Sequence, residues 1–256
     1  MTELAELAAL VVGWAAPGEE VEAYLSRSRT TNVRAYAGEV ESLSSAEPVG
    51  AGIRVITGHR QGFAWAGTLD ETVLKETLEE ARDNAGFGEP DEFFALAVPD
   101  GVAPPQLDLV RDELVSMPIA AKVDLALELE RTARSRDPRV TGVRVASFSD
   151  SYSETAMATT TGLTFSEASG ICYLAVNPLV EEDGDTQTGY GMSAGRAPSE
   201  LDIERAASDG VDRATRLLGA RKPPSRRLTV VLDPEVTADL LLSLIHISEP
   251  TRQAEI

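Results

Sequence analysis

The chain has 256 residues, of which 43% are hydrophobic and 25% are charged, an ordinary composition for a globular protein with a substantial core. Its 42 acidic and 23 basic residues give a formal net charge of −19. Because nucleic acids and anionic membranes repel such a polyanion, we expect neither as a partner. The single cysteine, Cys172, excludes an internal disulfide, and the N-terminus lacks the basic start of a signal peptide. These features predict a cytoplasmic location.

Residues 242–256 form a tail that differs in character from the rest of the chain. The run from Leu242 to Arg252 is similar to the translation of a transposase adapter used to build sequencing libraries. We therefore expect residues 242–256 to be non-native, residues 1–241 to be a fragment of a longer protein, and the tail to carry no information on fold or function. Excluding it removes His246, one of the two histidines.

The first 90 residues alternate between helical and strand patterns. Glycine after Thr57 favours a hairpin turn, and Thr68 opens a capping-box pattern before the second helix. Apolar spacing predicts a helix over 4–11, strands over 21–25 and 32–42 with a turn near Gly38, a hairpin over 49–65 and a helix closed by Gly86.

A proline-rich segment over residues 89–106 predicts an irregular connection to the rest of the chain. The residues after it predict a helix that starts at Pro118 with Ile119, Val123, Ala126, Leu127 and Ala133 on its apolar face, strands throughout 140–193, a helix over 203–218, a buried strand over 228–232 and a helix from Val236.

Strands in consecutive runs, rather than alternating singly with helices, favour an α+β domain with a largely antiparallel sheet and flanking helices. We expect this domain to span residues 1–222 and the start of a second, truncated domain to span 223–241. Lys222-Pro-Pro224 provides a stiff linker between the two.

Residues of the types that bind metals are few outside the tail. His59 stands alone near a predicted turn, where a surface position is favoured over a metal site. The run Glu181-Glu-Asp-Gly-Asp185 lacks the alternate spacing of a calcium loop, so a solvated hairpin tip is favoured. Residues 1–241 therefore supply no predicted metal, cofactor or catalytic residue.

Nucleophile and phosphate-binding patterns are equally weak. Cys172 lies in a strand pattern without a histidine partner, so a buried small hydrophobic residue is favoured over a nucleophile. Residues 147–161 are rich in serine and threonine, as expected for one face of a strand. Gly189, Gly191 and Gly195 do not follow a strand and open a helix, as a phosphate loop requires.

An ordered series of segments is spread along nearly all of residues 1–241, namely 32–41, 50–56 with 62–65 and the Thr68 helix, 181–185 with 193–196, and 228–241. This series resembles the N-terminal region of the TldD/PmbA family, once called modulators of DNA gyrase.

The resemblance implies two related subunit types, TldD and TldE (PmbA), which form a heterodimeric cytoplasmic metalloprotease that degrades or trims unfolded or modified peptides. The TldD type carries a His-Glu-x-x-x-His zinc motif in its second half, and the TldE type lacks these ligands. Asp233 and the acidic and small residues up to Leu241 are similar to the TldE version. We therefore expect a TldE/PmbA-type subunit without its own metal, and zinc in its TldD-type partner.

Two alternatives remain open. In the first, the chain is a truncated, zinc-bearing TldD-type subunit, because the family's zinc helix begins near residue 241. His246 falls near that helix, but it belongs to the adapter-like tail and Pro250 stands where a second histidine would be needed. The other alternative is a peptide-binding module whose sheet accepts an extended chain as an added strand.

Overall fold

The computed structural model describes residues 3–102, 105 and 107–248, with side chains up to Leu244. The chain divides into two compact units, Met1–Gly219 and Ala220–Ile256. The described part of the first unit holds one eight-stranded sheet, in which every strand pair is antiparallel, and flanking helices. The predicted α+β class is therefore confirmed. In the described ranges, no helix is both long and apolar enough to cross a membrane.

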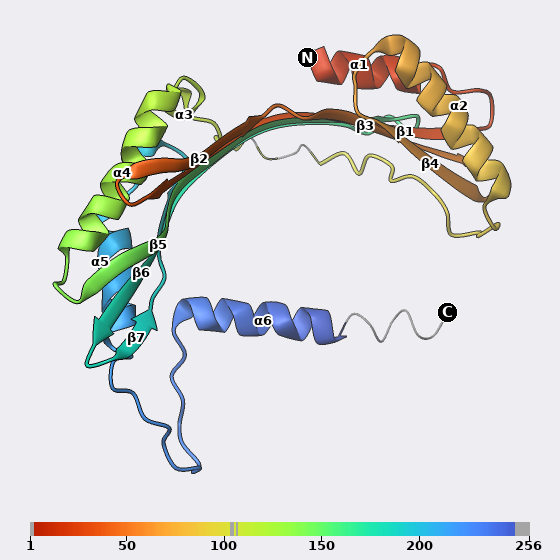
Figure 1. Ribbon diagram of the computed structural model, residues 1–256. Helices are drawn as coiled ribbons and strands as arrows, with labels where there is room; N and C mark the ends of the chain where they lie inside the picture. The colour runs from red at the N-terminus through yellow and green to blue at the C-terminus, as the bar shows by residue number, and fades with distance from the viewer. Residues whose placement is uncertain (1–2, 103–104, 106, 249–256) are drawn as a thin grey trace. The chain divides into compact units, whose positions relative to one another are not determined.

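Three long strands form the centre of the sheet (Figure 1). They are β1 (Glu20–Tyr36), β5 (Val140–Thr159) and β6 (Thr164–Glu182). The predicted strands over 21–25 and 32–42 are thus one strand to Tyr36, and β2 begins after a turn at Ala37 and Gly38, both with positive φ. A strand of 17 residues remains continuous because β5 pairs with it along most of its length.

Shorter strands complete the two edges of the sheet. On the β1 side, β3 (Val49–Thr57) pairs with the first part of β1 and β2 (Glu39–Ala46) with the last part, and β4 (Arg60–Ala66) pairs with β3. On the other side, β8 (Gly191–Gly195) and β7 (Asp185–Thr188) pair with the last part of β6.

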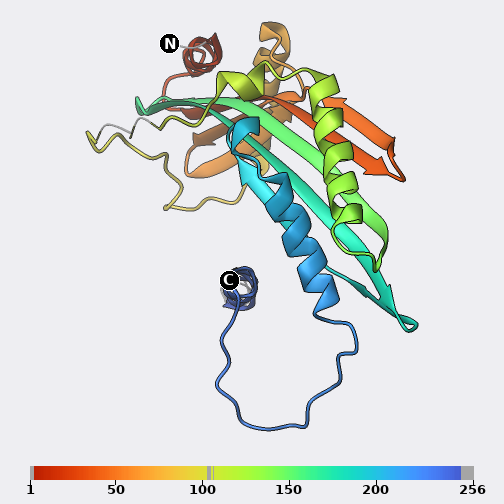
Figure 2. The same ribbon diagram turned by 90° about the vertical axis from the view of Figure 1, so that its left-hand side faces the viewer.

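All five α-helices described in the first unit cover one face of the sheet. In β1, Val21, Ala23, Leu25, Val33 and Ala35 are buried, and alternate residues point to one face of a strand. Figure 2 shows α4 and α5 side by side on this face. The helices are α1 (Glu3–Val12), α2 (Glu71–Phe87), α3 (Asp112–Val115), α4 (Ile119–Ser135) and α5 (Ile203–Thr215), with a 3-10 turn at Pro198–Glu200.

Two separate cores lie under these helices. At the α1–α2 end of the sheet, apolar residues from α1, α2, β1, β3, β4 and the end of β5 pack together around Leu25, Ile53 and Leu78. At the α4–α5 end, a second cluster forms around Phe148, Leu129 and Leu174. The long strands β1 and β5 contribute to both cores, so they hold the two ends together in one unit.

The buried side of α4 differs from the prediction. Ile119 is exposed, whereas Lys122 and Glu130 are buried. Lys122 is buried because it pairs with Asp150, and Glu130 because it accepts hydrogen bonds from the backbone N–H groups of Ala37 and Gly38. Polar partners have therefore rotated the helix away from the face that hydrophobic periodicity alone predicts.

The start of α2 also differs in detail. Asp70, rather than Thr68, is the N-cap, and its carboxylate accepts hydrogen bonds from the N–H groups of Thr72 and Val73. The Thr68 hydroxyl accepts from the N–H of Asp70. The helix continues past the predicted stop at Gly86 and ends before Gly88.

The second unit contains α6 (Pro234–Ser248), whose first turn is capped by the Asp233 carboxylate accepting from the N–H of Glu235. The predicted buried strand over 228–232 is wrong: the segment has no strand assignment, and Val231 is 92% exposed. An apolar segment becomes a buried strand only when a neighbouring strand pairs with it, and no described strand does.

Candidate functional site

The face of the sheet opposite the helices carries exposed aromatic side chains at the α1–α2 end. Trp65 is 73% exposed, Phe63 54% and Tyr24 46%. Together with Gly50 and Gly52 they line a shallow hollow of about 310 Å³. Large exposed apolar side chains gathered in one place mark a binding surface more often than scattered ones do.

This open face becomes polar toward β5 and β6. Tyr24 and Phe165 line a second hollow, of about 230 Å³, together with Ser153, Ser169 and other polar residues. The hydroxyls of Ser153 and Ser169 are 3.0 Å apart and hydrogen-bonded. The predicted serine- and threonine-rich strand face is therefore present and lies on the open side of the sheet, where it continues the aromatic patch.

The outer edge of β6 is the most distinctive feature next to this face. The N–H of Gly170 donates to the carbonyl of Leu109, away from β5, so even-numbered residues of β6 direct their backbone groups outward. From Cys172 to Val176 this edge pairs with β8. From Thr164 to Ala168 no described strand pairs with it.

A groove of about 490 Å³ runs beside this open part of the edge. It is lined by Thr164–Ala168 of β6, Met157 of β5, Ala5 and Ala9 of α1, and Pro105 with the segment 107–110. The groove is closed at one end by the bond of 2.9 Å from the Gly170 N–H to the Leu109 carbonyl. Arg196 adds weaker hydrogen bonds of 3.3 Å to the carbonyls of Leu109 and Gly170.

The charged groups that line the groove are both acidic. They are Asp108 and Glu167. Asp108 forms an exposed ion pair of 2.8 Å with Arg111, which lies three residues further along the same segment. Glu167 is exposed and has no hydrogen-bond or ion-pair partner among the described residues. The groove therefore offers a free carboxylate next to an open backbone edge.

Cys172 lies on the opposite, helix-covered face and is fully buried. Burial, and then the nearby Asp150 carboxylate, raise the pKa of its thiol to about 11. Its sulfur lies 3.5 Å from the Gly195 carbonyl. The thiol is therefore protonated at neutral pH and shielded, in agreement with the predicted structural role.

A buried ion pair lies close to Cys172. The ammonium of Lys122 is 2.5 Å from a carboxylate oxygen of Asp150 and donates a 2.9 Å hydrogen bond to the hydroxyl of Thr31. Asp150 is opposite Cys172 in the β5–β6 ladder. All three polar residues are more than nine-tenths buried. The cluster is internally satisfied, so its geometry fits a structural role.

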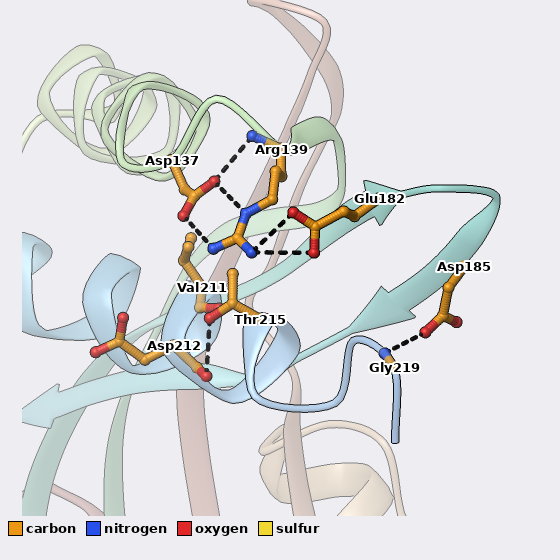
Figure 3. A network of polar contacts seen from close by, with 8 residues as sticks. All are labelled: Asp137, Arg139, Glu182, Asp185, Val211, Asp212, Thr215 and Gly219. Atoms are coloured by element: carbon orange, nitrogen blue, oxygen red, sulfur yellow. Dashed lines mark hydrogen bonds and ion pairs between the residues drawn. The ribbon is translucent and has the colours of Figure 1, made fainter. Parts of the chain in front are cut away.

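The acidic turn between β6 and β7 is more than a solvated tip (Figure 3). Asp183 and Gly184 have positive φ and form the exposed turn, as predicted. On either side of it, Glu182 reaches Arg139 at 3.4 Å and Asp185 accepts a 2.7 Å bond from the N–H of Gly219. These flanking carboxylates hold the residue before β5 and the turn that follows α5 next to the hairpin.

Arg139 also binds Asp137 within the same network (Figure 3). The guanidinium and the backbone N–H of Arg139 all donate to the Asp137 carboxylate, at 2.9 to 3.0 Å. These bonds lower the pKa of Asp137 to about 2. The arrangement fixes the loop between α4 and β5.

The glycines near β8 serve packing. A Cβ atom at Gly189 would lie 2.0 Å from the carbonyl oxygen of Gly210, and one at Gly191 would lie 1.9 Å from that of Ala206. Both acceptors belong to α5, so α5 lies directly on the strand backbone. Gly195 is similarly confined by the Glu200 side chain. The phosphate-loop interpretation is therefore not needed.

His59 is exposed in the β3–β4 turn, as predicted, and its backbone has positive φ. His246 falls within α6, beyond the residues whose side chains are described. In the part of the chain that the structure describes, no three His, Cys, Asp or Glu side chains are placed to hold a metal ion. A zinc ion therefore has no candidate ligand set among these residues.

Two parts of the chain match known domain families. Residues 21–85 match the family model "PmbA/TldA metallopeptidase domain 1", and residues 112–218 match "PmbA/TldA metallopeptidase central domain". The chain belongs to the TldD/PmbA family. The resemblance found in the sequence is therefore confirmed.

Two curated relatives illustrate the match. Metalloprotease PmbA of Escherichia coli O157:H7 is 28% identical over 235 residues, which cover 90% of this chain and 52% of that protein. A Metalloprotease TldD homolog of Haemophilus influenzae is 30% identical over 147 residues, which cover 57% of this chain and 30% of that protein. The chain thus spans about half the length, or less, of these relatives.

Solved structures share the fold. A modulator of DNA gyrase from Bacteroides thetaiotaomicron superposes with a TM-score of 0.76 at 18% identity, covering 85% of this chain and 51% of that one. TldE from Thermococcus kodakarensis superposes with a TM-score of 0.70 at 20% identity, covering 82% of this chain and 46% of that one.

Sequence reasoning missed two features of this site. The open edge of β6 depends on which strands pair beside it, which no local pattern specifies. The buried Lys122–Asp150 pair could have been suspected from a lysine at a position where helical spacing called for an apolar residue.

Proposed function

We propose that the chain is the N-terminal part of a PmbA/TldE-type subunit, without its own metal, in a cytoplasmic heterodimeric metalloprotease that processes unfolded or modified peptides. The observation that supports this proposal is the match to a PmbA protein along 90% of the chain. The zinc would be held by a TldD-type partner.

The partner can be tested by co-expression. The full-length product of this gene, carrying an affinity tag, should retain an untagged TldD-type homologue from the same organism during purification. Hydrolysis of an unfolded peptide should require both chains and should stop when a chelator removes zinc. Failure to form a complex, together with no gain of proteolysis on mixing, would remove the basis of the proposal.

The alternative is a zinc-bearing TldD-type subunit. The gene, read past the codon for Leu241 in the source genome, distinguishes the two. A His-Glu-x-x-x-His motif on the next helix would establish the TldD type, and its absence from the full-length product would support the PmbA type. A zinc measurement on the purified full-length protein provides an independent check, because only the TldD type should retain one metal ion per chain.

A second candidate function is peptide binding by strand addition. It is favoured by the open edge of β6 from Thr164 to Ala168 and by the groove beside it. In strand addition, main-chain hydrogen bonds to a sheet edge supply affinity, and neighbouring pockets select side chains. Both functions are compatible, since a subunit without a metal can still present peptides to its partner.

A further inference from the structure

We propose that the groove between α1, segment 107–110 and the edge of β6 binds an extended, positively charged peptide segment, which adds as a strand to Thr164–Ala168. The inference deepens the second proposed function and rests on it. It specifies where the peptide lies, how its backbone is held and which side chains it carries.

The backbone of β6 provides the first argument. Even-numbered residues direct their N–H and C=O groups away from β5, and the outward groups of Ser166 and Ala168 have no partner among the described residues. Unpaired groups on a sheet edge are a template for an added strand. Segment 107–110 already uses the same edge at Gly170, through the Leu109 carbonyl. An incoming peptide would continue this pairing toward Thr164.

The walls of the groove provide the second argument. Ala5 and Ala9 present small side chains from α1, and Thr164 and Ser166 present small ones from β6. A peptide strand places alternate side chains on opposite faces. Its helix-side residues therefore have room for aliphatic side chains, and a volume of about 490 Å³ lies within the range of ordinary ligand sites.

Charge provides the third argument and defines the occupant. On the open face, Glu167 has an unpaired carboxylate, and Asp108 lies on the opposite wall. A lysine or arginine in the peptide, placed opposite Glu167, would gain an ion pair next to the backbone bonds. A second copy of this chain fits poorly, because its net charge of −19 would repel the same surface.

The binding test uses the 256-residue chain alone, so it does not depend on any TldD-type partner. The probe is a fluorescein-labelled peptide of about eight residues that alternates valine and lysine, followed by fluorescence anisotropy. We expect saturable binding that weakens with salt, and at least about tenfold weaker binding of a valine–glutamate peptide of equal length.

Two N-methylated probes test the backbone contact. N-methylation removes a donor, so methylating the amides that face β6 should weaken binding about tenfold or more, whereas methylating the alternate amides should leave it within about twofold. Equal effects of the two methylation patterns would show that charge alone attracts the peptide and would overturn strand addition.

Protein variants test the location. Ser166→Pro removes an outward N–H and no bond to β5, a position that edge strands tolerate. It should weaken binding about tenfold, whereas Ser166→Ala, which keeps the N–H, should not. Glu167→Gln should weaken the lysine probe several-fold and leave a valine–threonine probe unchanged. Thermal unfolding of each variant shows that it folds.

Three results would overturn the proposal: no saturable binding of the valine–lysine probe, unchanged affinity in a folded Ser166→Pro variant, or concentration-dependent self-association that occupies the edge without peptide. Loss of binding in Ser166→Pro with retention in Ser166→Ala would support it. A missing TldD-type complex would contradict the metalloprotease proposal and leave this result unaffected.

Discussion

The strand β6 has two different environments along its length. At the α4–α5 end, residues from Gly170 to Val180 are mostly buried, and β8 and β7 pair with the outer edge. At the α1–α2 end, residues from Thr164 to Glu167 are exposed, and no described strand pairs with that edge. One strand is therefore central in one half of the sheet and an edge in the other.

The difference indicates where this fold can accept a partner. Natural proteins usually protect edge strands with charges, bulges or covering segments, because unpaired backbone groups invite pairing. Here the α4–α5 end is protected by β7, β8 and the packing of α5. At the α1–α2 end, the described residues that lie beside the edge in the groove include the charged Glu167 and Asp108 and the rest of the segment 107–110. We infer that the first arrangement serves stability and the second serves binding.

The two cores also differ in the polarity of the side chains that they enclose. The core at the α1–α2 end consists of apolar side chains such as Leu25 and Leu78. The core at the α4–α5 end additionally encloses the Lys122–Asp150 ion pair and the carboxylate of Glu130. Buried charges are costly unless paired, so stability at this end depends on specific partners rather than on buried area alone.

The largest predicted effect is at this ion pair. Asp150→Ala leaves the Lys122 ammonium buried without a counter-charge and should lower the free energy of unfolding by about 3–5 kcal/mol. Urea denaturation at neutral pH measures the loss. The double variant Lys122→Met with Asp150→Leu should recover most of it. A single variant within about 1 kcal/mol of the parent would contradict a role for the pair in stability.

The next effect tests the α1–α2 end by steric contact instead of charge. A Cβ atom at Gly62 would lie 2.0 Å from the carbonyl oxygen of Ala81 in α2. Gly62→Ala should therefore lower the free energy of unfolding by about 3 kcal/mol, the upper part of the range for overpacking. The matched control is Gly67→Ala, where no atom lies within 4 Å and stability should barely change. Equal thermal midpoints for the two variants would contradict the close approach of α2.

A kinetic measurement reports opening at the α4–α5 end. Cys172 is buried and burial raises its pKa to about 11, so at pH 8 the folded protein should react with a thiol reagent at least about a hundredfold more slowly than the urea-unfolded chain. Asp150→Ala should accelerate the reaction, and Gly62→Ala should accelerate it less. Equal acceleration would mean that the two ends open together.

The smallest predicted effect is a shift in the titration of Asp137. The Arg139 guanidinium lowers the pKa of this carboxyl to about 2, below the ordinary value near 3.9. The stabilisation is therefore fully present above about pH 4 and disappears as the pH falls through 2. Arg139→Gln should return the pKa toward its ordinary value in an NMR titration, whereas Arg131→Gln should not alter it. An unchanged pKa in Arg139→Gln would contradict the assignment.

Much of the fold follows from sequence patterns that act locally. The helix over 4–11, the β3–β4 hairpin and the turn near Gly38 depend on spacing and turn residues, and they are confirmed. The prediction of the buried face of α4 is wrong because Lys122 and Glu130 are held by residues distant in sequence. The prediction of a buried strand over 228–232 is wrong because a buried strand needs a neighbouring strand to pair with, and the sequence of the segment alone does not specify one.

The candidate site could be predicted less well, for a related reason. Glu167 and Ser166 belong to a segment that is predicted as a strand. Their exposure arises because β7 and β8 pair only with the later part of β6, and the pairing of β8 ends at Cys172. The family resemblance predicts peptide substrates, whereas the open edge of β6 is visible only in the assembled sheet. Pairing partners, rather than residue type, therefore define this site.

Amide hydrogen exchange of β6 tests the central claim most directly. In the chain alone, the outward amides of Ser166 and Ala168 should exchange much faster than those of Cys172 and Leu174, which pair with β8. Addition of the valine–lysine peptide should slow exchange at Ser166 and Ala168 and leave Cys172 and Leu174 unchanged. Protection of Ser166 and Ala168 without peptide, or no added protection at saturating peptide, would contradict an open edge that binds an extended chain.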